Sequence, residues 1–180
     1  IVAWSTRLRP LSIMLGWLGY RVWGVDPLAW HAFTLVLHVL CSLEVLCLAK
    51  LLSRRDCEAF LAAVIFSVFP RHHQPVLWLA ANQFLLSAAA VLLTLIVHIL
   101  YLRTGKPWLY ILTWGCAVVA LAANEASAVV FPLMLLTEVL VRAEVGSEGA
   151  VRRLLRSPRT YIRYAPLLLL LVFFLAVTFA

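Results

Sequence analysis

The sequence has 180 residues, of which 64% are hydrophobic and 13% are charged, about half the charged share of a typical soluble domain. A mean hydropathy of +0.99 excludes a soluble globular protein, so we expect an all-α, polytopic integral membrane protein. The formal net charge of +7 indicates loop orientation and not a nucleic-acid partner, because lysine and arginine gather on the cytoplasmic side of a membrane.

The chain opens with a short segment that ends at Arg9, followed by Pro10, which suits the first turn of a helix. Residues 11–24 are mostly apolar, but about 14 residues is short for a span, which needs about 20. The stretch carries aromatic residues and an arginine, as interfacial helices do: Trp17, Tyr20, Arg21 and Trp23. We therefore expect residues 1–25 to form an external segment with one interfacial helix.

Asp26 and Pro27 predict the start of the next helix, because aspartate caps helices and proline suits the first helical position. Five transmembrane helices are then expected in a core at residues 26–141, namely at 27–52, 57–69, 77–102, 108–123 and 126–141. A basic loop at 142–163 and a final span at 164–180 follow. The expected fold is a bundle of about six transmembrane helices plus the interfacial one.

The distribution of charge decides how the short stretch at 57–69 is interpreted. If this stretch crosses the membrane, most basic residues lie on one side: Lys50, Arg54, Arg55, Arg103, Lys106, Arg142, Arg152, Arg153, Arg156, Arg159 and Arg163. The other side holds Arg7, Arg9, Arg21 and Arg71. The positive-inside rule then places the 70–78 loop and Glu125 on the non-cytoplasmic side of a plasma membrane or an endoplasmic reticulum membrane.

Cysteine usage and the chain ends give two further expectations. The four cysteines lie in or beside apolar stretches without a CxxC motif, and we interpret them as small core residues without disulfides: Cys41, Cys47, Cys57 and Cys116. Because the sequence begins with Ile1 and is still apolar at Ala180, we expect a piece of a longer protein.

The loop at 70–78 is the most concentrated polar cluster between two long apolar stretches, and its two prolines prevent a continuous helix. His72, His73 and Gln74 are candidates for binding a sugar or a phosphate. They are also candidate ligands for a divalent metal ion, His72 above all. The alternative interpretation is a solvated polar turn.

Arginines on the same side form a second group of candidates. Arg9, Arg21 and Arg71 could each hold a phosphate, for which the planar guanidinium is well matched. The alternative for each is anchoring to lipid headgroups. His31 lies about one turn from the outer surface and is a candidate for the same site.

Three polar residues within or at the ends of the expected spans have simpler structural interpretations. For His38 we expect a hydrogen bond between helices. Glu44 must pair or stay neutral within the bundle. Glu125 begins a helix, where a carboxylate can act as a cap, and its place beside a short external turn makes it a candidate for the site as well.

Four motifs occur in order between residues 8 and 141. They are Arg9-Pro10-Leu11, then Gly24–Leu28 followed by Trp30–Leu40 with His31 and His38, then Phe66–Trp78, and finally Leu121–Leu133. They resemble "YRPL", "GLNP" with "FHLVNVLLHAL", "FAVHPVHTEAVAW" and "LLSKETAVVLPL" in the C-type membrane glycosyltransferases (GT-C). The resemblance is greatest to the protein O-mannosyltransferase branch, which includes the transmembrane and tetratricopeptide-repeat O-mannosyltransferases.

This resemblance implies a GT-C-like bundle that moves a sugar from a polyprenyl-phosphate carrier to an acceptor on the outer face. It further implies that Arg9 and Arg21 hold the lipid phosphate, while His72 and Glu125 line the sugar cavity. The family's catalytic acidic residue lies in the first external loop, which we expect before Ile1. The substrate-binding candidates are Arg9, Arg21, His31, His72, His73, Gln74, Trp78 and Glu125.

The sequence departs from the family pattern at four positions. Phe69, Gln74, Asn82 and Asn124 stand where the motifs have His, Glu, Arg and Lys. Gln74 can form hydrogen bonds but carries no charge, which weakens an acid–base or metal role for it.

Two other classes of function therefore stay open. One is a non-catalytic membrane subunit that packs a degenerate GT-C scaffold against protein partners or lipid. The other is a transporter with a proton path through His31, His38 and Glu44, although no internal repeats or paired broken helices support it. The expected partners are membrane lipid, a polyprenyl-phosphate sugar, and a protein acceptor or partner subunits, with no nucleic acid.

Overall fold

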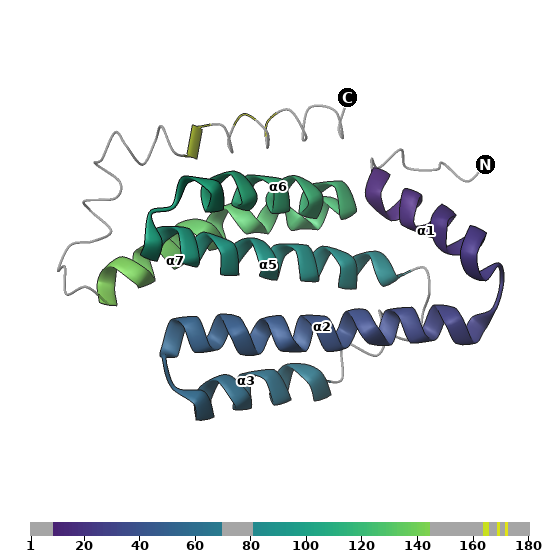
Figure 1. The fold of residues 1–180 in the computed structure, drawn as a ribbon, viewed down its shortest axis with the longest axis horizontal. Coiled ribbons are helices and arrows are strands. Elements are labelled where there is room, and N and C mark those ends of the chain that lie inside the picture. The colour runs from purple at the N-terminus through teal and green to yellow at the C-terminus, as the bar shows by residue number, and fades with distance from the viewer. Residues whose placement is uncertain (1–8, 70–80, 145–163, 166–168, 170–171, 173–180) are drawn as a thin grey trace.

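The computed structural model describes residues 9–69, 81–144, 164–165, 169 and 172. Within these residues all regular structure is helical (Figure 1). The elements are α1 (Pro10–Trp23), α2 (Pro27–Ser53), α3 (Asp56–Val68), α5 (Asn82–Thr104), α6 (Pro107–Ala123), the 3₁₀ helix η3 (Glu125–Val129) and α7 (Val130–Glu144). The 70–78 loop, most of the 142–163 loop and most of the expected final span lie outside the described residues.

Two of these helices, α2 and α5, are long and apolar enough to cross a membrane, and α6 is a shorter apolar helix of 17 residues. The prediction of an all-helical membrane protein is confirmed to this extent. Helix starts follow the local signals, since proline occupies an early position in α1, α2 and α6. The Asp26 side chain caps α2 by accepting a hydrogen bond of 3.0 Å from the Leu28 N–H.

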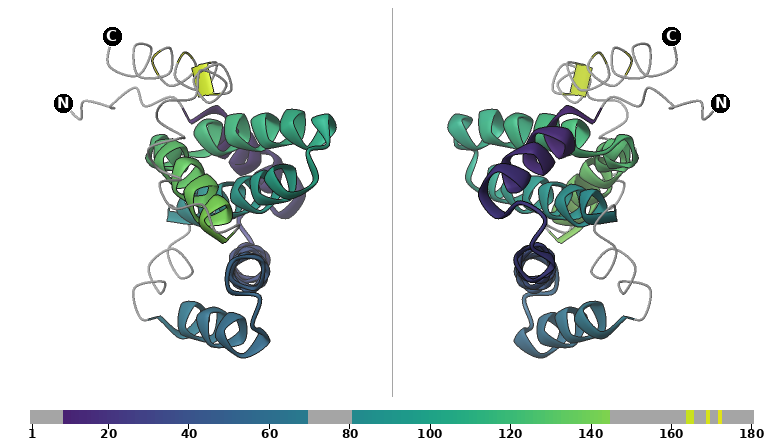
Figure 2. Two further views of the ribbon diagram at one scale, coloured as in Figure 1. Left: turned by 90° about the vertical axis from the view of Figure 1, so that its left-hand side faces the viewer. Right: turned by 90° about the vertical axis from the view of Figure 1, so that its right-hand side faces the viewer.

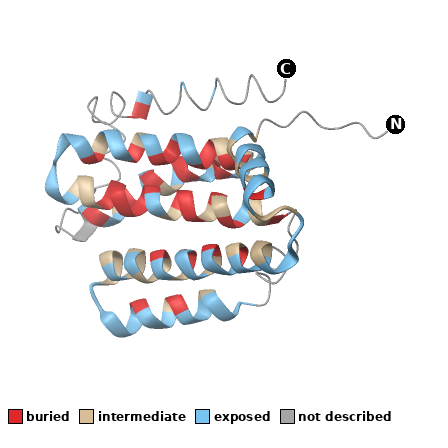
Figure 3. Ribbon diagram, turned by 45° about the vertical axis from the view of Figure 1, so that its right-hand side comes forward, coloured by how far each residue is buried: buried red, intermediate tan, exposed pale blue. Residues whose placement is uncertain are grey.

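Helix α5 lies at the centre of the described bundle and packs against α2, α6 and α7 (Figure 1). Figure 3 shows burial concentrated in this part of the molecule, whereas α3 is mostly exposed and most of α2 is exposed or intermediate. The α5–α6 contact contains alanines with little or no exposed surface, among them Ala90, Ala117 and Ala120. Small side chains allow close helix approach, which is the usual basis of packing in membranes.

The ends of the helices establish their directions. At the end of α5, the Arg103 Nη2 atom donates a hydrogen bond of 2.5 Å to the Leu51 carbonyl oxygen near the end of α2. Helices α2 and α5 therefore run in the same direction, and α3 runs back along α2. In the end-on views of Figure 2, α3 lies beyond α2 from the rest of the bundle. That residues 57–69 cross the membrane stays a prediction.

Three residues within the apolar helices can be compared with their expected roles. The His38 Nε2 atom lies 3.1 Å from the Ser67 carbonyl oxygen, so His38 makes the expected contact between helices. Glu44 is 9% exposed, and its Oε2 atom has no hydrogen-bond partner in the part of the chain that the structure describes. All four cysteines are free thiols, but Cys47 and Cys57 are exposed, because they lie on outward faces of α2 and α3. The interpretation as core residues is therefore wrong for Cys47 and Cys57, whereas Cys41 and Cys116 are buried as expected.

The helix expected at 126–141 begins differently from the prediction. Residues Glu125–Val129 form a 3₁₀ helix, and the α-helix starts only at Val130. Pro132 explains the break, because it has no N–H to donate to the carbonyl of residue 128 and its ring is accommodated in the first turn of a helix. The consequence is that Glu125 precedes α7 by more than one turn.

A buried polar cluster joins α5, α7 and the segment at Tyr164. Glu138 and His98 are 0% and 1% exposed. The Tyr164 hydroxyl donates a hydrogen bond of 2.5 Å to Glu138 Oε2 and lies 3.2 Å from His98 Nε2. The Arg142 Nη2 atom lies 2.5 Å from Glu138 Oε1. A buried carboxylate requires such partners because it has no water to bind.

Replacing Tyr164 with Phe should therefore destabilise the protein. The variant keeps the ring but removes one donor from a buried carboxylate, which costs about 1–3 kcal/mol. Denaturation of the detergent-solubilised full-length protein would measure the change. Tyr20→Phe is the matched control, because Tyr20 is 60% exposed. Equal stability of the two variants would contradict the importance of the buried hydroxyl.

The contact between α1 and α2 depends on a glycine. A Cβ atom at Gly19 would overlap Cη2 of Trp30, whereas a Cβ at Gly16 would meet nothing within 4 Å. Trp30 cannot move freely, because its Nε1 donates a hydrogen bond of 3.1 Å to the Gly24 carbonyl oxygen. Its ring also packs edge-on against Trp23, at 5.3 Å between ring centroids.

Gly19→Ala and Gly16→Ala should consequently have opposite effects. The first variant forces Trp30 or α1 to shift, which costs about 1–3 kcal/mol in stability. The second fills open space on the same helix and raises helix propensity, with a gain of up to about 1 kcal/mol. Thermal unfolding of both variants in detergent tests the close approach, and a Gly19→Ala protein as stable as wild type would disprove it.

Candidate functional site at the Arg9–Glu125 ion pair

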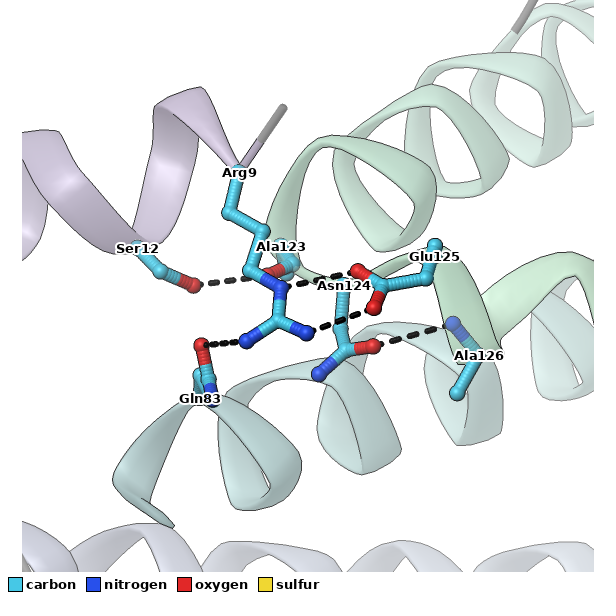
Figure 4. A network of polar contacts seen from close by, with 7 residues as sticks. All are labelled: Arg9, Ser12, Gln83, Ala123, Asn124, Glu125 and Ala126. Atoms are coloured by element: carbon cyan, nitrogen blue, oxygen red, sulfur yellow. Dashed lines mark hydrogen bonds and ion pairs between the residues drawn. The ribbon is translucent and has the colours of Figure 1, made fainter. Parts of the chain in front are cut away.

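Arg9 and Glu125 meet at the end of the bundle where α1 and α5 begin and α6 ends. Arg9 precedes α1, and Glu125 opens η3. The Arg9 Nε atom donates to Glu125 Oε2 at 2.8 Å, and Nη2 donates to Oε1 at 2.5 Å (Figure 4). This two-point pairing matches the planar guanidinium to the carboxylate and is among the strongest side-chain contacts. It joins residues that are 116 positions apart.

Two further contacts attach α1 to its neighbours. The Arg9 Nη1 atom donates a hydrogen bond of 2.8 Å to Oε1 of Gln83, which lies in the first turn of α5. The Ser12 hydroxyl donates one of 2.7 Å to the Ala123 carbonyl oxygen. Ala123 is the last residue of α6, where carbonyls have no partner within the helix, so Ser12 satisfies one of them. We call Arg9, Ser12, Gln83, Asn124 and Glu125 the Arg9 cluster.

Asn124, and not Glu125, caps the helix that follows. Its Oδ1 atom accepts a hydrogen bond of 2.9 Å from the Ala126 N–H. The expectation that Glu125 acts as the cap is therefore wrong, because its carboxylate is turned toward Arg9. Asn124 is 1% exposed, and its Nδ2 atom has no hydrogen-bond partner in the described part of the chain. Leaving a buried donor unpaired costs about 1–3 kcal/mol.

Partial burial strengthens the ion pair, and the two opposite charges balance each other. The side chains of Arg9 and Glu125 are 20% and 23% exposed, in contrast to 61% and 80% for the pair Lys50–Asp56. The hydrogen bond to Glu125 raises the pKa of Arg9 above its usual value, although burial acts in the opposite direction. Arg9 stays cationic, and the pair with an ionised Glu125 has no net charge.

Arg21 and His31 lie apart from this cluster. Arg21 is exposed, and its guanidinium carbon lies 5.0 Å from the centre of the Trp17 ring, in a cation–π contact. Twelve residues of helix separate Arg9 from Arg21, which is about 18 Å along the axis, so the two cannot grip one phosphate group together. His31 is exposed in the second turn of α2.

The structure thus brings together Arg9 and Glu125 from the residues expected at the site. His72, His73, Gln74 and Trp78 lie outside the described residues. Ser12 and Gln83 were missed, and Asn124 was noted only as a departure from a motif. Each is a polar residue at the end of an apolar helix, and that is the one signal the sequence offers for them.

A small pocket adjoins the cluster between α1, α2 and α5. Its lining is mostly apolar, with polar groups only from Ser12 and Asn82: Ser12, Leu15, Gly16, Trp30, Phe33, Leu37, Asn82 and Leu86. In the described part of the chain, no three side chains among His, Cys, Asp and Glu lie close enough to hold a metal ion. A divalent metal at His72 stays a prediction.

These observations define a helical membrane protein with a partly buried, charge-balanced cluster at one end of its bundle. The chain is similar to protein O-mannosyl-transferase Tmtc1 of Drosophila melanogaster, with 28% identity over 142 residues. The similarity covers 79% of this chain and 16% of the fly protein. No protein-family model matches the chain, and no solved structure matches it.

A double-mutant cycle should show that the Arg9–Glu125 pair is coupled. Arg9→Ala and Glu125→Ala should each lower the free energy of unfolding by about 1–3 kcal/mol, since each removes a two-point hydrogen-bonded contact from a partly buried charge. The double variant should lose about 1–2 kcal/mol less than the sum. The exposed pair Lys50–Asp56 serves as control and should show no measurable coupling. Additive losses at Arg9 and Glu125 would refute the pairing.

Proposed function

We propose that this chain is part of a membrane glycosyltransferase that moves a sugar from a polyprenyl-phosphate donor to an acceptor on the non-cytoplasmic face. The similarity to a protein named as an O-mannosyl-transferase supports a transferase-like role. The observation that carries the proposal is the Arg9–Glu125 pair. Its two residues come from separate motifs that resemble the O-mannosyltransferase family, and they meet at one end of the bundle.

The proposal includes a topology of six spans, in which α3 crosses as a short helix. Basic residues support the orientation. Lys50, Arg54, Arg55 and Arg103 lie at the ends of α2 and α5, opposite the end that carries Arg9 and Glu125. Because cytoplasmic loops carry an excess of positive charge, the Arg9 cluster is assigned to the outer face of the plasma membrane or the endoplasmic reticulum membrane.

Within this site we assign different roles to the two arginines. Arg21 contacts no carboxylate among the described residues and lies beside an aromatic ring at the expected interface, so it is the better residue for the lipid phosphate. Arg9 is neutralised by Glu125 and belongs with it in the wall of the sugar cavity. His31 and the 70–78 residues complete the proposed cavity. No residue of this chain is assigned as the catalytic base.

The alternative is a non-catalytic membrane subunit built on the same scaffold. The closed Arg9–Glu125 pair favours it, because the two charges satisfy each other and hold helices together without a ligand. Sugar transfer separates the two functions. A full-length protein that transfers no sugar from polyprenyl-phosphate mannose would support the subunit and exclude the enzyme.

In the transfer assay, Arg21→Ala should raise the KM for polyprenyl-phosphate mannose about tenfold or more, because a charge-assisted contact to phosphate is worth about 1.5–3 kcal/mol. Arg55→Ala is the control, because Arg55 is exposed at the opposite end and pairs with Glu58. Its KM should equal that of wild type. An unchanged KM in Arg21→Ala would show that this arginine does not hold the donor.

A further inference from the structure

The Asn124 amide has a donor that the fold leaves unused. Its oxygen accepts the hydrogen bond from the Ala126 N–H. A flipped amide would point its NH₂ group at that N–H, so that two donors would face each other. The Nδ2 atom is therefore a donor by necessity, and it is buried without a hydrogen-bond partner among the residues that the structure describes. Figure 4 shows this nitrogen turned away from Ala126, toward the side of the cluster where Gln83 lies.

The neighbouring groups can both donate and accept. The Arg9 guanidinium has five N–H groups, and its three described hydrogen bonds occupy one on each nitrogen. Nη1 and Nη2 thus each keep one further donor. Gln83 and Glu125 supply carboxamide and carboxylate oxygens with additional lone pairs. Donors and acceptors lie within one group of contacts, at the end of the bundle where α1 and α5 begin.

The charge of the cluster decides what kind of ligand fits. Among the described residues the one cation of the cluster is Arg9, which already pairs with Glu125, so an entering phosphate would face the Glu125 carboxylate. Like charges held close in a poorly solvated site repel each other. A sugar hydroxyl carries no charge, and it accepts and donates at the same time. The mixed character of the Arg9 cluster therefore suits a neutral polyol and not an anion.

We propose that the Asn124 Nδ2 atom donates a hydrogen bond to a hydroxyl group of the transferred sugar and thereby positions it against Arg9 and Glu125. This inference rests on the proposed function and deepens it. The hydroxyl oxygen accepts from the second N–H of Arg9 Nη1, whose other N–H is bound to Gln83 Oε1. Asn124 is then a determinant of sugar binding in a position where the resembling motif has lysine.

Binding of methyl α-mannopyranoside to the detergent-solubilised full-length protein tests this role without requiring transfer. Saturation-transfer NMR titration would give the affinity. Asn124→Ser should weaken binding about tenfold, because serine also caps helices but lacks the amide donor. Asp26→Ser is the matched control, since Asp26 caps α2 through the same contact two residues ahead. It should bind the sugar as wild type does.

Two further measurements make every outcome decisive. Thermal unfolding of each variant shows whether the cap survives, and Asn124→Asp keeps the cap acceptor if serine does not. Inorganic phosphate should not compete with the sugar in wild type, but it should compete in Asn124→Lys, which adds a positive charge. Three outcomes would each overturn the inference. They are wild-type affinity in a folded Asn124→Ser or Asn124→Asp protein, no mannoside binding at all, and competition by phosphate in wild type. A wild-type protein that binds the mannoside as expected but transfers no sugar would overturn the proposed function alone.

Discussion

The bidentate pair of Arg9 and Glu125 is the contact on which this end of the structure depends. A chain with 64% hydrophobic residues has few polar groups to satisfy a guanidinium at the edge of a helix bundle. Glu125, which follows the end of α6, satisfies the Arg9 guanidinium together with Gln83 of α5. One side chain thereby ties the start of α1 to two other segments, and Ser12 adds a fourth bond to the last turn of α6.

At the opposite end of the bundle, polar side chains again join separate helices. Glu138 is fully buried, and Tyr164 and Arg142 both bind it. Arg103 reaches across to the Leu51 carbonyl oxygen. Between the two ends, α5 and α6 pack through apolar side chains, with alanines where the two helices approach each other. Polar contacts at the ends establish which helices are neighbours, and small residues determine how close they come.

Charge balance within the Arg9 cluster has a functional consequence. A guanidinium that already holds a carboxylate offers no net field to an anion, so the phosphate of a lipid donor needs a different cation. Arg21 is the suitable one, because it is exposed and lies about 18 Å farther along α1. The cluster itself suits uncharged hydroxyl groups. The contact with Glu125 thus moves Arg9 from the phosphate, to which the family resemblance assigned it, to the proposed sugar position.

Local signals in the sequence determined most of the helices and the Asp26 cap. Asp26 with Pro27 predicts the start of α2, and composition predicts a helical membrane protein, because these effects act within a few residues or over the whole chain. The tertiary structure alone decided that Glu125 pairs with Arg9, which leaves the cap to Asn124. It also decided that Gln83 joins them and that Arg21 does not. Contacts between residues 74 and 116 positions apart depend on how helices pack, and no local pattern encodes that.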